Sequence, residues 1–146
     1  MDQWPAKRTQ LGALEIRRAL PLREKRMVGP WCFLDRYGPL TFRAGKPMDV
    51  APHPHTGLQT VSWLLDGEVL HRDSLGFESM IVPGELNLMT SGRGISHSEE
   101  TPGHASGVLN GVQLWVALPD VVRLTDPAFN HYQGLPVTET RGGSIR

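Results

Sequence analysis

An all-β fold, arranged as a sandwich or barrel of short strands, is the architecture that the sequence predicts. The chain has 146 residues, which is enough for one domain with a substantial core. It contains 16 Gly and 12 Pro, and such a density of helix-interrupting residues favours many short elements separated by turns. The apolar runs are short and most end at a turn signal, as in all-β sandwiches and barrels.

The predicted strands follow one another along most of the chain. Residues 11–26 are interrupted by Pro21, and we interpret them as a strand followed by an exposed, charged connection. Later segments are rich in β-branched and aromatic residues or alternate between apolar and polar residues, and the first of them ends at the hairpin signal Asp66-Gly67. These predicted strands are residues 58–65, 68–74, 78–82, 85–90 and 111–118.

The composition narrows the possible classes of function. Lys+Arg and Asp+Glu both number 15, and this balance argues against nucleic acid or an anionic membrane as the main partner. Cys32 is the single cysteine, and we interpret it as a small buried apolar residue. A lone thiol also fits a protein in a reducing compartment. Neither a signal segment nor a bilayer-spanning apolar run is evident. We therefore expect a cytoplasmic protein with one domain over residues 1–146, in which residues 138–146 form a flexible tail.

Two residue pairs, His53 with His55 and His97 with Glu99, carry the main indication of chemistry. Residues i and i+2 of a strand project to the same face, so each pair would point in one direction. Glu100 would point to the opposite face, so Glu99 is the candidate carboxylate. If the two strands face each other inside a barrel, three imidazoles and one carboxylate converge.

This donor set suits a divalent Fe, Mn, Co, Ni, Cu or Zn ion. It lacks the thiolate of most structural zinc sites, and four protein ligands would leave two positions of an octahedral ion open for water, substrate or dioxygen. Pro54 cannot donate to a β-ladder, so the histidine pair is expected at the start of a strand or on an edge, near a barrel mouth. The alternative is that the pairs are solvated loop residues, because a single His-x-His pattern is weak.

Strand parity gives a candidate for the surroundings of the site. Counted from His53 without a bulge, the histidine face continues through Val61, Trp63 and Leu65. With Met89 from a neighbouring strand, these side chains would line a pocket of aromatic size. Simple core packing is the interpretation that we favour for them.

Other polar residues receive weaker interpretations. His71 and Asp73 share a strand face, and we favour a solvent-facing pair on an outer strand over a pair that orients a ligand imidazole. Arg93, between two glycines, is interpreted as a turn residue rather than an anion-binding one, and His104 and His131 as surface residues. A basic cluster is expected to be a solvated face: Arg17, Arg18, Arg23, Lys25 and Arg26.

Four segments together resemble the pirin family of the cupin superfamily, in order, from about residue 13 to residue 137. They are MVGPWCFLDRYGPL, PHPHTGLQTVSWLLDGEVLHRDSLG, PGELNLMTSGRGISHSEE and VQLWVALP. The resemblance implies a cupin jelly-roll. It also implies that His53, His55, His97 and Glu99 match the metal site of the family, with Fe(II) as the expected ion and Ni, Mn, Cu or Zn also accepted. The general cupin pattern has a glutamate where this chain has Gln59, but in pirins the second motif supplies the carboxylate.

The family resemblance also implies a function. Some pirins resemble quercetinases, which open flavonols with dioxygen, and on that analogy Glu99 would be both a metal ligand and the catalytic base for a small aromatic substrate. The alternative is a metal-dependent regulatory module that acts through protein–protein contacts without catalysis, and a third possibility is a folded chain without function. Pirins typically have two cupin domains in tandem and this sequence matches the first, so we expect a homodimer that replaces the second domain.

Overall fold

The computed structural model describes residues 4–11, 14–103 and 107–145. All thirteen elements of these residues are β-strands. In this described part of the chain there is accordingly no helix of the length and apolarity that crossing a membrane requires.

The strands form two large sheets and a hairpin. The larger sheet has seven strands in the order β1-β2-β3-β10-β5-β8-β11, and the smaller has four in the order β4-β9-β6-β7. The larger sheet comprises β1 (Lys7–Leu11), β2 (Leu14–Leu20), β3 (Trp31–Phe42), β10 (Gly107–Ala117), β5 (Leu58–Asp66), β8 (Leu86–Thr90) and β11 (Ala128–Tyr132). The smaller comprises β4 (Asp49–His55), β9 (Ile95–Glu100), β6 (Val69–Asp73) and β7 (Glu78–Ile81). The hairpin pairs β12 (Thr138–Thr140) with β13 (Gly143–Ile145).

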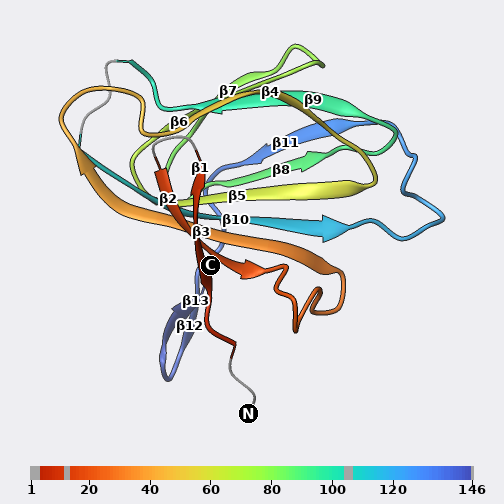
Figure 1. Ribbon diagram of the computed structural model, residues 1–146, viewed down its shortest axis with the longest axis horizontal. Coiled ribbons are helices and arrows are strands. Elements are labelled where there is room, and N and C mark those ends of the chain that lie inside the picture. The colour runs from red at the N-terminus through yellow and green to blue at the C-terminus, as the bar shows by residue number, and fades with distance from the viewer. Residues whose placement is uncertain (1–3, 12–13, 104–106, 146) are drawn as a thin grey trace.

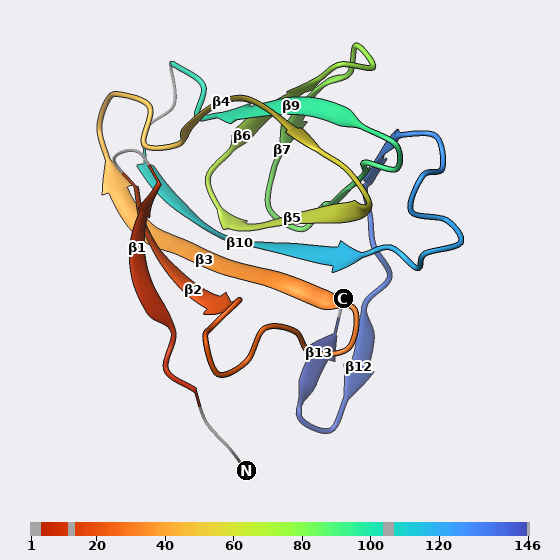
Figure 2. The same cartoon turned by 45° about the vertical axis from the view of Figure 1, so that its right-hand side comes forward.

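The two large sheets face each other and enclose a common interior (Figure 1). Seen from a second direction, β4, β9, β6 and β7 curve over β5, β10 and β3 in the manner of an open barrel (Figure 2). All paired strands are antiparallel. The all-β prediction is thus confirmed, and each strand predicted from the sequence overlaps an observed one.

The interior is divided into three layers. An apolar cluster fills one end and consists of Leu14, Ile16, Tyr37, Met48, Leu64, Val69, Ile81 and Leu109. A small cluster at the other end consists of Met89, Ile95 and Phe129. A polar belt of hydrogen-bonded side chains lies between them: Arg18, Asp35, Ser62, His71, Asp73, His97, Glu99 and Gln113.

The course of individual strands shows why the belt lies there. Along β5 the inward side chains run from Leu64 in the apolar cluster through Ser62 to Thr60, which is paired with Met89 of the small cluster. Along β9 they run from Ile95 of the small cluster to His97 and Glu99. Period-two alternation therefore carries polar groups into the middle of the interior on both sheets.

The parity prediction across residues 53–65 was wrong. The inward face of β5 carries Ser62 and Leu64, whereas Leu65 is 48% exposed and Trp63 is half-buried on the outer face. The reason is the turn at Gly57, whose φ is +68° and which separates β4 in the smaller sheet from β5 in the larger sheet. Parity does not continue through such a turn. Met89, in contrast, is core, as we favoured.

Two smaller expectations concern Cys32 and the C-terminal residues. Cys32 is half-buried, its thiol lies 3.5 Å from the Trp115 carbonyl oxygen, and burial raises the pKa of this thiol. Residues 138–146, predicted as a flexible tail, include the β12–β13 hairpin, and their flexibility stays a prediction.

Candidate metal centre

Neighbouring strands β4 and β9 bring the predicted histidines together. β4 is an edge strand, as expected from Pro54, and His53 is directly opposite His97 across the β4–β9 ladder. His55 lies one strand repeat further along β4 on the same face. Potential ligand nitrogens of His53, His55 and His97 all lie within 4.8 Å of one another, and we call these residues the three-histidine cluster.

The geometry of this cluster fits a shared metal ion. His55 Nε2 and His97 Nε2 are 3.1 Å apart. Two imidazole nitrogens that each lie about 2.1 Å from one ion are separated by about 3 Å when the angle between them is near 90°. The Nδ1 atom of His53 donates to the Ala51 carbonyl oxygen at 2.9 Å, which leaves its Nε2 lone pair free for a ligand.

The electrostatics favour neutral imidazoles, which are the form that binds metals. His55 is 8% exposed and His97 is 2% exposed. Burial, reinforced by the neighbouring His53, lowers the pKa of His55 to about 4. Burial, reinforced by the surrounding histidines, lowers the pKa of His97 to about 3. Both rings are therefore uncharged near pH 7 and retain a lone pair for coordination.

Glu99 lies in the belt beside this cluster. It is 6% exposed, and its two carboxylate oxygens accept hydrogen bonds from Ser62 Oγ at 3.0 Å and Gln113 Nε2 at 2.8 Å. In the described residues it falls within 4.8 Å of His71 and His97, so the structure forms two overlapping groups that share His97. A role of Glu99 as fourth ligand to the three-histidine cluster stays a prediction.

The contrast between Glu99 and Glu100 follows strand parity, as predicted. Glu100 points out of the sandwich and forms ion pairs with Lys46 and Arg72. These partners hold the pKa of Glu100 below its ordinary value. Of these two adjacent glutamates, Glu99 thus faces the interior and Glu100 faces the surface.

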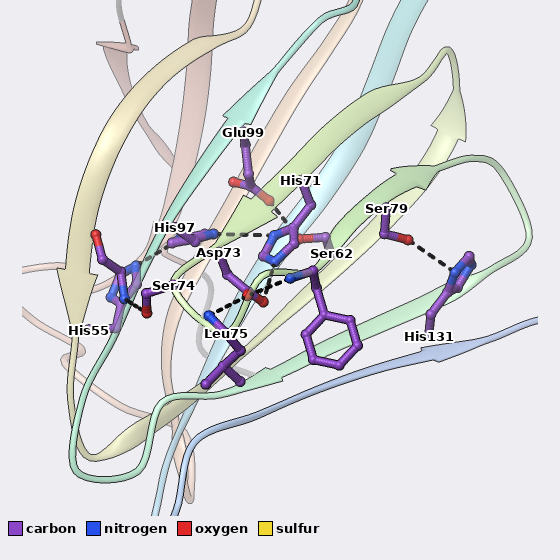
Figure 3. Close-up of polar contacts among 12 residues, drawn as sticks. His55, Ser62, His71, Asp73, Ser74, Leu75, Ser79, His97, Glu99 and His131 are labelled. Carbon is purple, nitrogen blue, oxygen red and sulfur yellow. Dashed lines mark hydrogen bonds and ion pairs between the residues drawn. The ribbon is translucent and has the colours of Figure 1, made fainter.

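The interpretation of His71 and Asp73 as a solvent-facing pair was wrong. Their side chains are 2% and 0% exposed, because β6 lies between β9 and β7 and its inner face is covered from the larger sheet by Phe129. His71 Nε2 is 3.1 Å from Asp73 Oδ2, and His71 Nδ1 is 3.4 Å from His97 Nδ1. Figure 3 shows His97 between His55 and His71 in a continuous series of contacts.

Three other interpretations have mixed outcomes. His131 is not a surface residue: its side chain is 22% exposed, and its Nε2 lies 2.6 Å from Glu85 Oε2. Its Nδ1 lies 3.2 Å from Ser79 Oγ (Figure 3). His104 lies outside the described residues. Arg93 is an exposed turn residue that pairs with Asp126, as expected of a turn.

The basic cluster is solvated only in part. Arg17 is exposed, but Arg18 donates from Nε and Nη2 to the buried Asp35 carboxylate at 2.9 and 2.7 Å. Its guanidinium also lies 4.5 Å from the centre of the Phe33 ring. The expectation of a uniformly solvated face was therefore wrong for Arg18, which reaches into the polar belt.

A cavity of about 410 Å³ opens beside the cluster, and both His53 and Glu99 line it. Phe33 and Trp115 form its aromatic wall, with ring centres 4.0 Å apart and planes inclined by 13°. Its other lining residues are Leu11, Arg18, Asp35, Val50 and Gln113. Sequence reasoning missed this wall. The available signal was the alternation of Gln113 and Trp115 along a strand that was itself predicted.

The comparisons with known proteins agree with this architecture. The sequence profile of the pirin family matches residues 13–116. The chain belongs to the pirin family. It is 47% identical over 148 residues to a pirin-like protein of Caulobacter vibrioides, covering 97% of this chain and 51% of that protein.

Solved structures show the same fold. The crystal structure of quercetin 2,3-dioxygenase from Acinetobacter baumannii superimposes with a TM-score of 0.91 and 51% identity, covering 95% of this pirin-family chain and 46% of that one. The bacterial pirin YhhW from Escherichia coli, solved in complex with nickel(II), gives a TM-score of 0.74 at 22% identity over 88% of this chain and 54% of that one, which establishes likeness of fold alone. The predicted cupin jelly-roll is confirmed, and the chain spans about half the length of these relatives.

Proposed function

We propose that this chain binds one divalent transition metal ion through His53, His55 and His97, with Glu99 as the fourth ligand. Three imidazoles and a carboxylate without a thiolate form a donor set for Fe, Mn, Co, Ni, Cu or Zn, and Fe(II) remains the expected ion. The support is the convergence of the three imidazoles within 4.8 Å and the location of Glu99 two residues after His97 on the same inward face.

We further propose that the site oxidises a small, planar aromatic substrate of the flavonol type with dioxygen. The observation that carries this proposal is the cavity that joins His53 and Glu99 to the stacked rings of Phe33 and Trp115. Its volume of about 410 Å³ lies in the range of small-molecule sites, roughly 300–1,000 Å³. The 51% identity to a quercetin 2,3-dioxygenase supports the same substrate class.

The residues of the cavity have separate tasks in this proposal. The Phe33–Trp115 pair offers an aromatic wall against which a planar substrate packs. Each oxygen of Glu99 accepts one hydrogen bond from the protein and has a second lone pair, so the carboxylate can accept the proton of a substrate hydroxyl. Ser62 and Gln113 hold this carboxylate in place. A metal ion, when bound, would stabilise negative charge on a substrate oxygen.

The test is metal analysis followed by oxygen uptake. Protein purified without a chelating tag is assayed for metal, loaded with Fe(II) or Ni(II), and mixed with quercetin in an oxygen electrode. We expect about one ion per chain and flavonol-dependent oxygen consumption, both reduced in His53→Ala/His97→Ala. Glu100→Gln is the matched control for Glu99→Gln, because the two residues are adjacent on β9 and face opposite sides.

The outcomes separate the alternatives. Loss of turnover with retained metal in Glu99→Gln, and unchanged turnover in Glu100→Gln, would support the base role of Glu99. Metal binding without oxygen uptake would eliminate the oxygenase and favour the regulatory module. Absence of metal after reconstitution would eliminate both.

We also propose that two copies of the chain form a homodimer. The outer face of the larger sheet carries half-buried apolar side chains: Val61, Trp63, Leu86, Leu88, Val112, Leu114 and Val116. Such a face is typical of a surface that another subunit covers. Light scattering should give the mass of a dimer, and Leu114→Lys should shift it to the mass of a monomer. A monomeric wild-type protein would contradict this proposal.

A further inference from the structure

We propose that Asp73 and His71 are positioning residues that fix the tautomer of His97, so that a lone pair of His97 Nε2 faces the other two histidines. This inference rests on the proposed metal function of the three-histidine cluster. It differs from that function in what it predicts, because the tautomers of the rings can be measured in the metal-free protein. The evidence is a series of contacts that begins at a carboxylate and ends at the cluster (Figure 3).

The series starts with the Asp73 carboxylate, which is completely buried. One oxygen, Oδ1, accepts the backbone N–H groups of Leu75 at 2.9 Å and Phe77 at 3.2 Å. The other oxygen, Oδ2, lies 3.1 Å from His71 Nε2. An ionised carboxylate only accepts hydrogen bonds, so His71 Nε2 must carry the hydrogen.

The hydrogen on His71 Nε2 determines the next contact. When the His71 ring carries a single hydrogen, at Nε2, its Nδ1 is an acceptor. It lies 3.4 Å from His97 Nδ1, and this contact is a hydrogen bond only if His97 Nδ1 carries its hydrogen. His71 is kept in this orientation by stacking on Phe129, with ring centres 4.2 Å apart and an interplanar angle of 11°.

The position of the hydrogen on His97 Nδ1 determines the state of the other ring nitrogen, Nε2. With its hydrogen on Nδ1, His97 presents a lone pair at Nε2, 3.1 Å from His55 Nε2. This is the tautomer that a metal ion in the cluster requires. His71 and His97 are both 2% exposed, so solvent offers these nitrogens little competition and their partners in the belt decide the tautomer.

The isosteric substitution Asp73→Asn should exchange donor and acceptor at each hydrogen bond between residue 73, His71 and His97. In Asp73→Asn, the amide oxygen stays with the two backbone N–H groups and the amide nitrogen faces His71, to which it donates. His71 then carries its hydrogen on Nδ1 and donates it to His97. His97 in turn holds its hydrogen on Nε2, which blocks the position that the metal needs. A residue with only a packing role would not produce this reversal, because Asn has the shape of Asp.

The experiment records long-range ¹H–¹⁵N spectra of metal-free protein with ¹⁵N-labelled histidine, which distinguish the two tautomers of each ring. We expect His97 as the Nδ1–H tautomer in the wild type and as the Nε2–H tautomer in Asp73→Asn. Co(II) affinity should fall by about 10- to 100-fold in Asp73→Asn. Arg72→Gln, between the two positioning residues on β6 but facing outward, is the matched control and should change neither readout.

A second variant keeps the test valid if Asp73→Asn folds poorly. His71→Phe retains the stack on Phe129 but offers no acceptor to His97, so Co(II) affinity should fall while pulsed EPR of the Cu(II) form shows an unchanged number of bound imidazoles. Loss of one bound imidazole would identify His71 as a direct ligand and overturn the proposal, as would a wild-type His97 with its hydrogen on Nε2. Correct tautomers without metal binding would instead refute the metal function alone.

Discussion

The apolar cluster and the polar belt occupy the same interior but are organised by different forces. Members of the apolar cluster, such as Leu64 and Leu109, are at most 1% exposed and hydrogen-bond only through their backbones. Belt residues such as His97 and Glu99 are almost as buried, yet each of their side chains has a named polar partner. Burial is favourable for the first group without further conditions, whereas the second is tolerated only because its hydrogen bonds are satisfied.

The difference indicates that the stability of the fold and the candidate metal site depend on different residues. Burial of the apolar cluster favours folding, whereas burial of the ionisable groups of the belt opposes it unless they are hydrogen-bonded. Substitutions in the belt should therefore weaken metal binding and leave the protein folded. Substitutions in the apolar cluster should lower the free energy of unfolding and leave metal binding unchanged.

The largest expected effect is in the belt, where His97→Ala should abolish the metal site. His97 is the residue shared by both groups of potential ligands, so its loss should lower Co(II) affinity by more than the roughly 10- to 100-fold expected for an outer partner. The circular dichroism of the metal-free variant should stay that of a folded β protein. Titration calorimetry measures the affinity, and wild-type binding by the variant would place the site elsewhere.

The apolar cluster should show the reverse pattern in Leu64→Ala. Leu64 is 1% exposed, and truncating such a leucine costs about 2–5 kcal/mol of unfolding free energy. The adjacent Leu65→Ala, at a position 48% exposed, is the matched control and should cost less than about 1 kcal/mol. Urea unfolding measures both, while metal stoichiometry at low temperature should be unchanged. Equal costs at the two positions would contradict the observed strand parity.

Acid should destabilise the metal-free protein through the buried histidines of the three-histidine cluster. In the folded protein the pKa values of His55 and His97 are lowered to about 4 and about 3, whereas in the unfolded chain they return to about 6.5. As the pH falls below about 6.5, the unfolded state takes up protons that the folded state does not, so stability decreases by up to about 1.4 kcal/mol per pH unit for each histidine.

Urea unfolding at pH 7, 6.5, 5.5 and 4.5 measures this slope. A His55→Phe variant should have a shallower slope between pH 6.5 and 4.5 than the wild type. A slope that is the same in both proteins would show that His55 does not carry the acid sensitivity.

The smallest effect is expected on the outer face of the same strand. Glu100→Gln removes an exposed carboxylate that pairs with Lys46 and Arg72, and exposed pairs contribute about 0–1 kcal/mol. Metal affinity should equal that of the wild type. A large loss of metal in this variant would mean that the inward and outward assignments of Glu99 and Glu100 are reversed.

The sequence predicted the features that depend on local pattern. Short alternating runs predicted the strands, and the spacing of His97 and Glu99 predicted a shared inward face, as found in the structure. Pro54 predicted either the start of a strand or an edge strand, and the edge strand is the alternative found. These properties follow from the period of a β-strand and from the missing N–H of proline.

Features that depend on how strands are assembled were not predictable in this way. The burial of His71 depends on β6 lying between β9 and β7, and the burial of His131 depends on its partner Glu85, which is distant in sequence. The outward direction of Trp63 depends on the turn at Gly57, where the chain passes from one sheet to the other. Each of these facts belongs to the packing of two sheets rather than to any single segment.

The most direct test of the three-histidine cluster as a metal site is anomalous diffraction from crystals of the Co(II)-loaded protein, with data collected above and below the cobalt absorption edge. We predict one anomalous peak per chain within bonding distance of nitrogens from His53, His55 and His97, with the Glu99 carboxylate as the next ligand. A cobalt peak at another place in the chain, or no peak in crystals prepared with an excess of Co(II), would contradict the assignment.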